Sequence, residues 1–205
     1  MRADSDIAEV GLVERSRRGD ADAFNLLVEK YQQQVYNFAL RMLGSAEAAA
    51  DVTQEAFLSA FRNMARFRGG SFRGWLFRIV SNACYDELRS RQRQPSTSLE
   101  ALMEDSGNPI DFPNGAESPE DRTLRLELAW YLQRALQALP PDQRMVVLLC
   151  DVHGLSYEEI AEVTGTNLGT VKSRLSRGRA HLRDYLRQHS ELLPSVYRQR
   201  SSDDP

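Results

Sequence analysis

The chain has 205 residues, 41% of them hydrophobic, which suffices for one medium core or two small ones. Its 26 basic and 29 acidic residues give a net charge of −3, and Lys30 and Lys172 are the only lysines, so nearly all positive charge is arginine. No apolar run approaches the length of a membrane span and no signal-peptide core is present, so we expect a cytoplasmic protein without membrane insertion.

Neither cysteine nor histidine usage points to chemistry. Cys84 and Cys150 fall in helical stretches with apolar neighbours, which is typical of core packing. The three histidines share no ligand spacing with them. The sequence therefore predicts no cofactor, no metal and no catalytic residue.

The first half of the chain is helical in pattern. Residues 1–19 are polar and are expected to be partly frayed, whereas apolar residues at helical spacing predict a helix over 21–43, capped by Asp20 and ended by Gly44. A second helix is expected over 46–65. Its inner face is predicted to consist of Val52, Ala56, Phe57, Ala60, Phe61 and Met64.

The outward face of that second helix combines acidic and amide groups with an apolar one. It carries Asp51, Gln54, Glu55, Leu58 and Arg62. Such a face suits docking of a basic partner, although solvated helix faces have the same composition.

A glycine loop and a basic helix follow. The sequence Phe67-Arg68-Gly69-Gly70-Ser71-Phe72 predicts a surface loop, and Ser71 can cap a helix over 72–93. One face of that helix mixes basic, aromatic and amide groups, namely Arg78, Asn82, Tyr85, Arg89 and Arg93. This mixture is typical of contact with melted nucleic acid, whereas Trp75 and Phe77 are interpreted as core residues.

Residues 94–121 contain seven acids, four prolines and no lysine or arginine, and their periodicity is lost. We expect an acidic flexible linker, which offsets the arginines elsewhere in the net charge. Beyond it, a helix is expected over 122–138 with Leu124, Leu128, Tyr131, Leu132, Ala135 and Leu136 inward. Asp142 is then predicted to cap a short helix that Gly154 ends.

The stretch 155–186, LSYEEIAEVTGTNLGTVKSRLSRGRAHLRDYL, has helix-turn-helix spacing. Ser156 and Glu159 form a capping-box pattern, Gly165 supplies a turn with positive φ, and Asn167 can cap the second helix. That helix has one apolar stripe, and its other faces carry Lys172, Arg174, Arg177, Arg179, Arg183 and Arg187. A capped helix pair with this charge predicts binding in the DNA major groove.

Four segments in this order resemble the extracytoplasmic-function sigma factors, the small sigma subunits of bacterial RNA polymerase. They are DVTQEAFLSAFRN, FRGGSFRGWLFRIVSNACYDELR, LPPDQRMVVLL and LSYEEIAEVTGTNLGTVKSRLSRGRAHL, and the resemblance spans roughly 20–190. It implies an all-α fold of two small helical domains joined by the acidic linker. The implied divisions are a polar segment 1–19, sigma region 2 at 20–93, the linker 94–121, sigma region 4 at 122–188 and a polar tail 189–205.

The resemblance also implies a role for each matched segment. Docking on core polymerase, at the β′ clamp helices, is expected at Asp51, Gln54, Glu55 and Leu58. Capture of a flipped minus-ten base and contact with the melted non-template strand are expected at Phe67, Arg68, Ser71, Phe72, Arg73, Arg78 and Asn82. Reading of the minus-thirty-five duplex is expected at Thr170, Lys172, Ser173, Arg174, Ser176 and Arg177.

The implied function is that of a sigma factor. It binds core RNA polymerase (β′ and β), selects promoters and promotes melting, in a stress or envelope response under an anti-sigma factor. Two other hypotheses remain open. One is a helix-turn-helix regulator that is no polymerase subunit, which leaves 67–93 unexplained. The other is an enzyme acting on nucleic acid, for which the sequence offers no metal cluster or acid–base pair.

Overall fold

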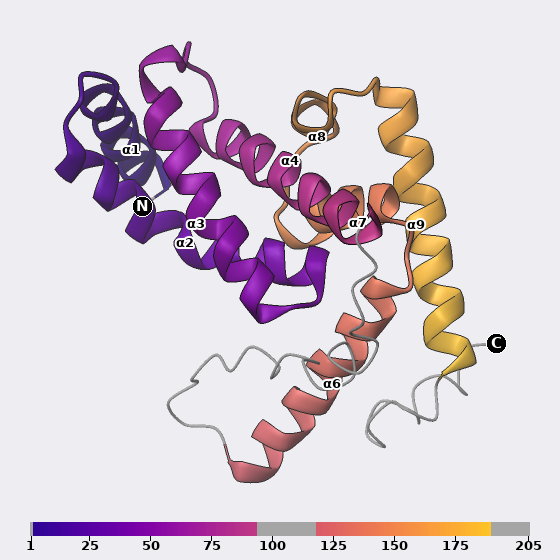
Figure 1. Ribbon diagram of the computed structural model, residues 1–205. Helices are drawn as coiled ribbons and strands as arrows, with labels where there is room; N and C mark the ends of the chain where they lie inside the picture. The colour runs from indigo at the N-terminus through magenta and orange to yellow at the C-terminus, as the bar shows by residue number, and fades with distance from the viewer. Residues whose placement is uncertain (1, 94–117, 190–205) are drawn as a thin grey trace.

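The structure is a computed structural model that describes residues 2–93 and 118–189, and these ranges contain helices and no strand. The first domain comprises α1 (Arg2–Arg17), α2 (Ala21–Leu43), α3 (Ala46–Asn63), the 3-10 turn η1 (Met64–Arg66) and α4 (Phe72–Arg93). The second comprises α6 (Pro119–Gln137), α7 (Pro141–Val147), the π-helical turn η2 (Leu148–Val152), α8 (Tyr157–Thr164) and α9 (Leu168–Gln188). The all-α, two-domain prediction is confirmed (Figure 1).

Capping residues begin and end these helices where the sequence indicates. The Asp20 carboxylate accepts from the Ala23 N–H at 2.9 Å, and Gly44, at φ +75°, ends α2. In the second domain, Ser156 and Glu159 form a complete capping box on α8. Gly165 at φ +63° makes the turn, and Asn167 caps α9 through the Thr170 N–H. The predicted helix-turn-helix is therefore present.

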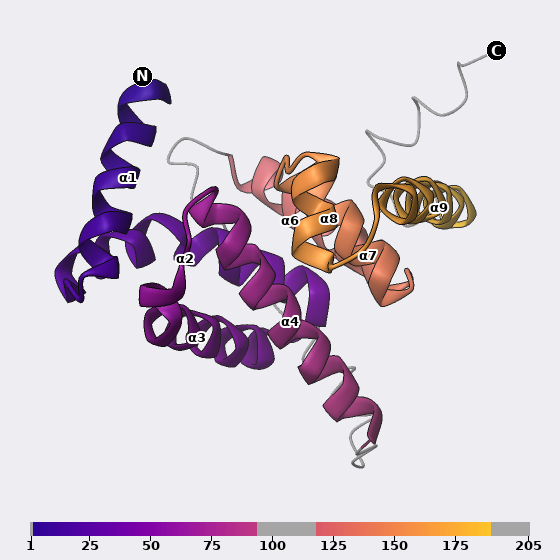
Figure 2. The same ribbon diagram turned by 90° about the horizontal axis from the view of Figure 1, so that it is seen from above.

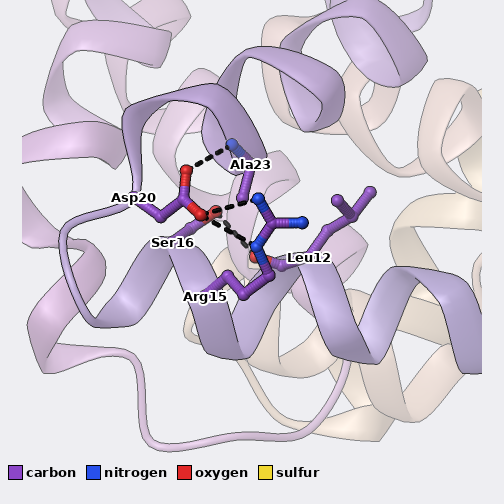
Figure 3. Close-up of polar contacts among 5 residues, drawn as sticks. All are labelled: Leu12, Arg15, Ser16, Asp20 and Ala23. Atoms are coloured by element: carbon purple, nitrogen blue, oxygen red, sulfur yellow. Dashed lines mark hydrogen bonds and ion pairs between the residues drawn. The ribbon is translucent and has the colours of Figure 1, made fainter.

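The prediction of a frayed N-terminal segment is wrong, because residues 2–17 form the helix α1. Val13 and Ser16 are buried on α1, and Leu12 packs against the core of the first domain. Figure 3 shows the joint between α1 and α2, where Arg15 Nε donates to the Asp20 carboxylate at 2.8 Å and Ser16 Oγ donates to the Leu12 carbonyl. A short apolar stripe in a polar segment was enough to order this helix against α2.

Three further expectations need correction in the second domain. The Ser118 side chain caps α6, so that helix begins at Pro119, inside the expected linker. Pro140 is the N-terminal capping position of α7. Asp142 lies within the first turn of that helix, so Asp142 is not the cap. Leu132, predicted inward, is 40% exposed. Figure 1 shows that the first half of α6 extends away from the other helices.

The two domains pack against each other through side chains of α6 and α7 that donate hydrogen bonds to the C-terminal end of α2. Gln133 and Gln137 of α6 donate to the carbonyls of Leu40 and Arg41, at 3.1 and 2.9 Å, and Arg144 of α7 donates to the carbonyl of Met42. The last carbonyls of a helix have no partner within it. Side chains of the second domain therefore supply hydrogen-bond donors to the backbone carbonyls at the C-terminal end of α2 in the first domain.

The expectations for the acidic linker and the polar tail concern mainly residues 94–117 and 190–205, which lie outside the described residues. Within the described part, no helix is long and apolar enough to cross a membrane.

Candidate nucleic-acid interface

Helix α9 presents a cationic face to solvent because its apolar face is held tightly by the rest of the second domain. Val171, Leu175 and Gly178 are buried. At Gly178 the approach to α7 is so close that an added Cβ would lie 2.8 Å from Cγ2 of Val147. Such contact fixes the rotation of the helix and so decides which side chains point outward.

The predicted recognition residues lie on the outward side or at its border. Lys172, Ser176 and Arg177 are exposed, and Thr170, Ser173 and Arg174 are half-buried. Lys172 and Arg177 make no ion pair with any described residue. A lysine and an arginine five residues apart on a rigid helix can reach phosphates or guanine edges in a major groove.

Two other arginines of α9 are engaged within the protein. Arg174 Nε lies 3.0 Å from the Asp142 carboxylate, and Arg179 donates from Nε and Nη2 to Asp151 at 3.0 and 2.5 Å. The hydrogen bonds to Asp151 raise the pKa of Arg179. These pairs reduce the net positive charge at the border of the cationic face, whereas Lys172 and Arg177 are exposed and make no ion pair with any described residue.

The predicted minus-ten loop is arranged differently from the expectation. Phe67 and Phe72 are 5% and 3% exposed, so neither ring offers a face to a base in this structure. With Trp75 they form a cluster whose ring centroids lie 5.2 to 6.1 Å apart. In this structure both rings anchor the ends of the loop, and their contact with a base stays a prediction.

The tip of the loop lies between these anchors and is exposed. It consists of Arg68, Gly69, Gly70 and Ser71, and both glycines have positive φ, +93° and +88°. Ser71 Oγ accepts from the Gly74 N–H at 3.0 Å and so caps α4 as predicted. The side chains free to meet a nucleic acid here are Arg68 and Ser71.

Arg73 points toward the second domain. Its guanidinium donates to the backbone carbonyl of His153 and lies over the Phe77 ring, 5.6 Å from the centroid. The His153 ring is buried between Phe38 and Phe77, at centroid distances of 5.6 and 4.7 Å. A residue predicted to contact promoter DNA is thus part of the contact between the domains.

Arg78 and Asn82 are both exposed on α4, but their surroundings differ. Asn82 lies in a groove between α3 and α4 whose lining includes Asp51, Glu55, Asp86 and Glu87. A phosphate backbone is disfavoured beside four carboxylates. The basic face expected around Asn82 is therefore bordered by an acidic groove, and the contact of Asn82 with melted DNA stays a prediction.

The four predicted docking residues of α3 are all exposed, on two sides of one ridge. Asp51 and Glu55 face the acidic groove, whereas Gln54 and Leu58 line a groove between α2 and α3. Phe61 lines this second groove as well and is 45% exposed, although it was predicted to be inward. Its position three residues after Leu58 and seven after Gln54 is the signal that places it on the docking face.

Neither metal nor thiol chemistry is indicated by the geometry. Among the described residues, no group of three His, Cys, Asp or Glu side chains could hold a metal ion. Burial raises the pKa of Cys84 to about 12, so its thiol stays protonated and behaves as a core residue, as predicted.

Two family profiles match the chain in the order of its domains. Sigma-70 region 2 matches residues 27–94 and sigma-70 region 4 matches residues 129–182. The RNA polymerase sigma-H factor of Pseudomonas aeruginosa is 42% identical over 175 residues, which cover 82% of this chain and 88% of that protein. The ECF RNA polymerase sigma-E factor of Escherichia coli is 40% identical over 173 residues, which cover 82% of this chain and 88% of that protein. The chain belongs to the extracytoplasmic-function sigma factors.

Two more comparisons place this sigma factor among its relatives. The ECF sigma factor SigE of Mycolicibacterium smegmatis is 44% identical over 165 residues, which cover 80% of this chain and 62% of SigE. The fold is similar to that of the sigma factor RpoE of Bartonella quintana, whose structure was solved with the anti-sigma factor NepR. The TM-score is 0.63 at 26% identity, over 80% of this chain and 96% of that one. Helix α1 precedes both family matches.

Proposed function

We propose that this sigma factor docks on core RNA polymerase through the exposed ridge of α3. It directs the polymerase to promoters that carry a minus-ten and a minus-thirty-five element. The observation that carries the proposal is that one chain presents both an exposed docking ridge and a separate exposed cationic helix. Asp51, Gln54, Glu55 and Leu58 meet the β′ clamp helices, with Phe61 added to that contact by its exposure. Carboxylates and an apolar groove together suit a helix pair with basic and apolar groups.

The two DNA elements are read by different domains. Lys172, Ser173, Ser176 and Arg177 meet the minus-thirty-five duplex from α9, with Thr170 and Arg174 at the border. The loop tip at Arg68 and Ser71, with Arg78, meets the non-template strand at the minus-ten element once it is melted. Extruding a base costs a few kcal/mol, which contacts by a positioned loop offset.

An anti-sigma factor is the proposed inhibitory partner. The support is that the similar RpoE structure contains one, NepR, and that both proposed contact surfaces of this chain are exposed and could be covered. Such a partner would compete with core polymerase at α3 or with DNA at α9.

Run-off transcription with purified core polymerase tests the proposal. Specific transcripts are expected only when the chain and core polymerase are both present, and mapping of their start sites would identify the promoter elements. A chain that shifts promoter DNA but never starts transcripts would instead be a helix-turn-helix regulator. Asp51→Arg should reduce core binding by reversing a charge on the ridge, and it should leave duplex binding by α9 unchanged.

A further inference from the structure

Helix α1 is joined to α2 by the Glu9 carboxylate, which accepts hydrogen bonds from two side chains of α2. Glu9 Oε2 accepts from the Tyr31 hydroxyl at 2.7 Å and from Lys30 Nζ at 2.5 Å. Tyr31 is 4% exposed, and the Glu9 side chain is 17% exposed. Burial of both partners makes this bond to a charged acceptor stronger than one at the surface.

The Tyr31 ring continues this connection toward the loop. It lies 5.7 Å, centroid to centroid, from the ring of Phe72, the first residue of α4. Phe72 packs in turn on Phe67 and Trp75, and Phe67 is the residue at which the loop leaves η1. Helix α1 also contacts η1 directly, and Figure 2 shows it beside the chain that leads into α4.

The loop tip depends on these anchors for its conformation. An added Cβ at Gly69 or at Gly70 would meet no atom within 4 Å, so no neighbouring group holds these two glycines from that side. Two glycines with positive φ add backbone freedom. The positions of Phe67 and Phe72 therefore fix where Arg68 and Ser71 point.

We propose that Glu9 of α1 is a positioning residue for minus-ten recognition, acting through the Tyr31 hydroxyl and the Tyr31–Phe72 ring contact on the loop tip. The proposal rests on the proposed role of the loop in binding the melted strand. It assigns a part in promoter recognition to a helix that lies outside the region 2 match at residues 27–94. Glu9 itself does not touch DNA.

The test uses the full chain bound to core polymerase and a single-stranded oligonucleotide that carries the minus-ten sequence of a promoter mapped by run-off transcription. Tyr31→Phe removes the hydrogen bond to Glu9, and Glu9→Ala removes it together with the ion pair to Lys30. Both variants are expected to weaken binding about fivefold or more. The double variant is expected to match Glu9→Ala, because the bond to Tyr31 is lost only once. Glu9→Gln, which keeps an acceptor for the hydroxyl, should recover most of the loss.

Selectivity separates positioning from a general loss of structure. In the positioning variants, the preference for the minus-ten sequence over a scrambled strand should fall, while the affinities for core polymerase and the minus-thirty-five duplex stay unchanged. Glu14→Gln is the matched control, since Glu14 lies on α1 and pairs only locally with Arg17, and it should leave the preference intact. An equal loss of all three affinities, or an unchanged preference in Tyr31→Phe, would overturn the proposal.

Arg68→Ala distinguishes this failure from failure of the proposed function. If Arg68→Ala weakens strand binding and the Glu9 and Tyr31 variants do not, only the positioning role is wrong. If Arg68→Ala and the positioning variants all leave strand binding unchanged, the loop is not a DNA contact, and both the proposed role of the loop and the positioning role fail.

Discussion

The two candidate DNA-contacting regions differ in how much of the molecule each one needs. The cationic face of α9 is complete within the second domain: the capping residue, the buried stripe and the outward side chains all belong to it. The minus-ten loop instead depends on α1 through Tyr31, and its neighbour Arg73 is bound to His153 of the other domain. In both views of the molecule, α1 and α9 lie at opposite ends (Figures 1 and 2).

Under the proposed function, this difference predicts that the two elements are read under different conditions. The duplex-reading helix is preformed and needs no rearrangement, so its affinity should depend on its own side chains and on salt. Arg73 is bound to the His153 carbonyl, so its guanidinium can contact the melted strand only when the contact between the domains opens. Four predictions test this contrast, from the largest expected effect to the smallest.

Removing two unpaired cations from the first half of α9 should have the largest effect. Lys172→Ala with Arg177→Ala is expected to weaken binding of the minus-thirty-five duplex by about 2–6 kcal/mol, since one good base contact contributes about 1–3 kcal/mol. Fluorescence anisotropy at fixed salt measures this affinity. The matched pair Arg68→Ala with Arg78→Ala removes the same amount of charge from the first domain and should leave the duplex affinity unchanged. If both pairs reduced duplex affinity equally, the two regions would not be separate readers.

Arg144 is the residue on which the second domain and the domain contact both depend. Arg144 is 5% exposed, and its guanidinium donates to the carbonyls of Gln137, Leu139 and Met42. Burial lowers its pKa to about 10, so it remains charged at neutral pH. Arg144→Met leaves buried carbonyls without donors and should lower the free energy of unfolding by about 3 kcal/mol, measured by urea denaturation.

Arg134→Ala provides the control for Arg144. Arg134 is exposed and lies over the Trp130 ring, 4.7 Å from its centroid, so its loss should reduce stability by no more than about 1 kcal/mol. Equal destabilisation by the two substitutions would mean that the buried hydrogen bonds of Arg144 contribute little to the fold.

The helices were predictable where their signals are local. Caps such as Asp20 and Ser156 act within one turn, and apolar periodicity places α2, α3 and α9 without knowledge of the tertiary structure. Exposure of Phe61 was not predicted, because a mixed apolar stripe is wider than the surface that the neighbouring helices cover. Only the packing of α2 on α3 decides which part of the stripe stays open.

The exposure of the candidate site residues was predictable for α9 and only partly for the loop. Lys172 and Arg177 are exposed because helical geometry places them opposite the buried stripe. The burial of Phe67 and Phe72 and the engagement of Arg73 result from contacts with α2 and with the second domain, about 40 and 80 residues away in sequence. No local pattern carries that information, and the same holds for the role of Gln137 at the end of α2.

The close approach at Gly178 tests how rigidly α9 is held. Gly178→Ala would force the new Cβ against Val147 and should destabilise the second domain by about 1–3 kcal/mol. Gly11→Ala is the control with the opposite sign: an added Cβ there meets no atom within 4 Å, and alanine favours a helix by about 1 kcal/mol over glycine. Thermal unfolding of both variants measures the difference. Stabilisation by Gly178→Ala would show that α9 can shift on α7 and that its outward face is not fixed.

The smallest predicted effect is a pH dependence of the contact between the domains. Burial, followed by the charges of Arg73 and Arg41, lowers the pKa of His153 to about 4. The neutral ring packs between Phe38 and Phe77, whereas protonation favours the solvated ring of the open form. The stabilisation by neutral His153 is therefore full above the ordinary pKa of 6.5 and is lost as the pH falls toward 4. Between pH 7.5 and 5.5 the contact should weaken about tenfold.

Energy transfer between dyes on the two domains of the full chain would measure this opening, with the His153 ring titration followed by NMR in the same sample. His153→Phe keeps an apolar ring without a titrating group, so the change between pH 7.5 and 5.5 should disappear in that variant. A ring that titrates near 6.5 in the intact chain would mean that His153 is solvated. Arg73 would then lack the partner that distinguishes the minus-ten region from α9, and both DNA-contacting regions would be equally accessible.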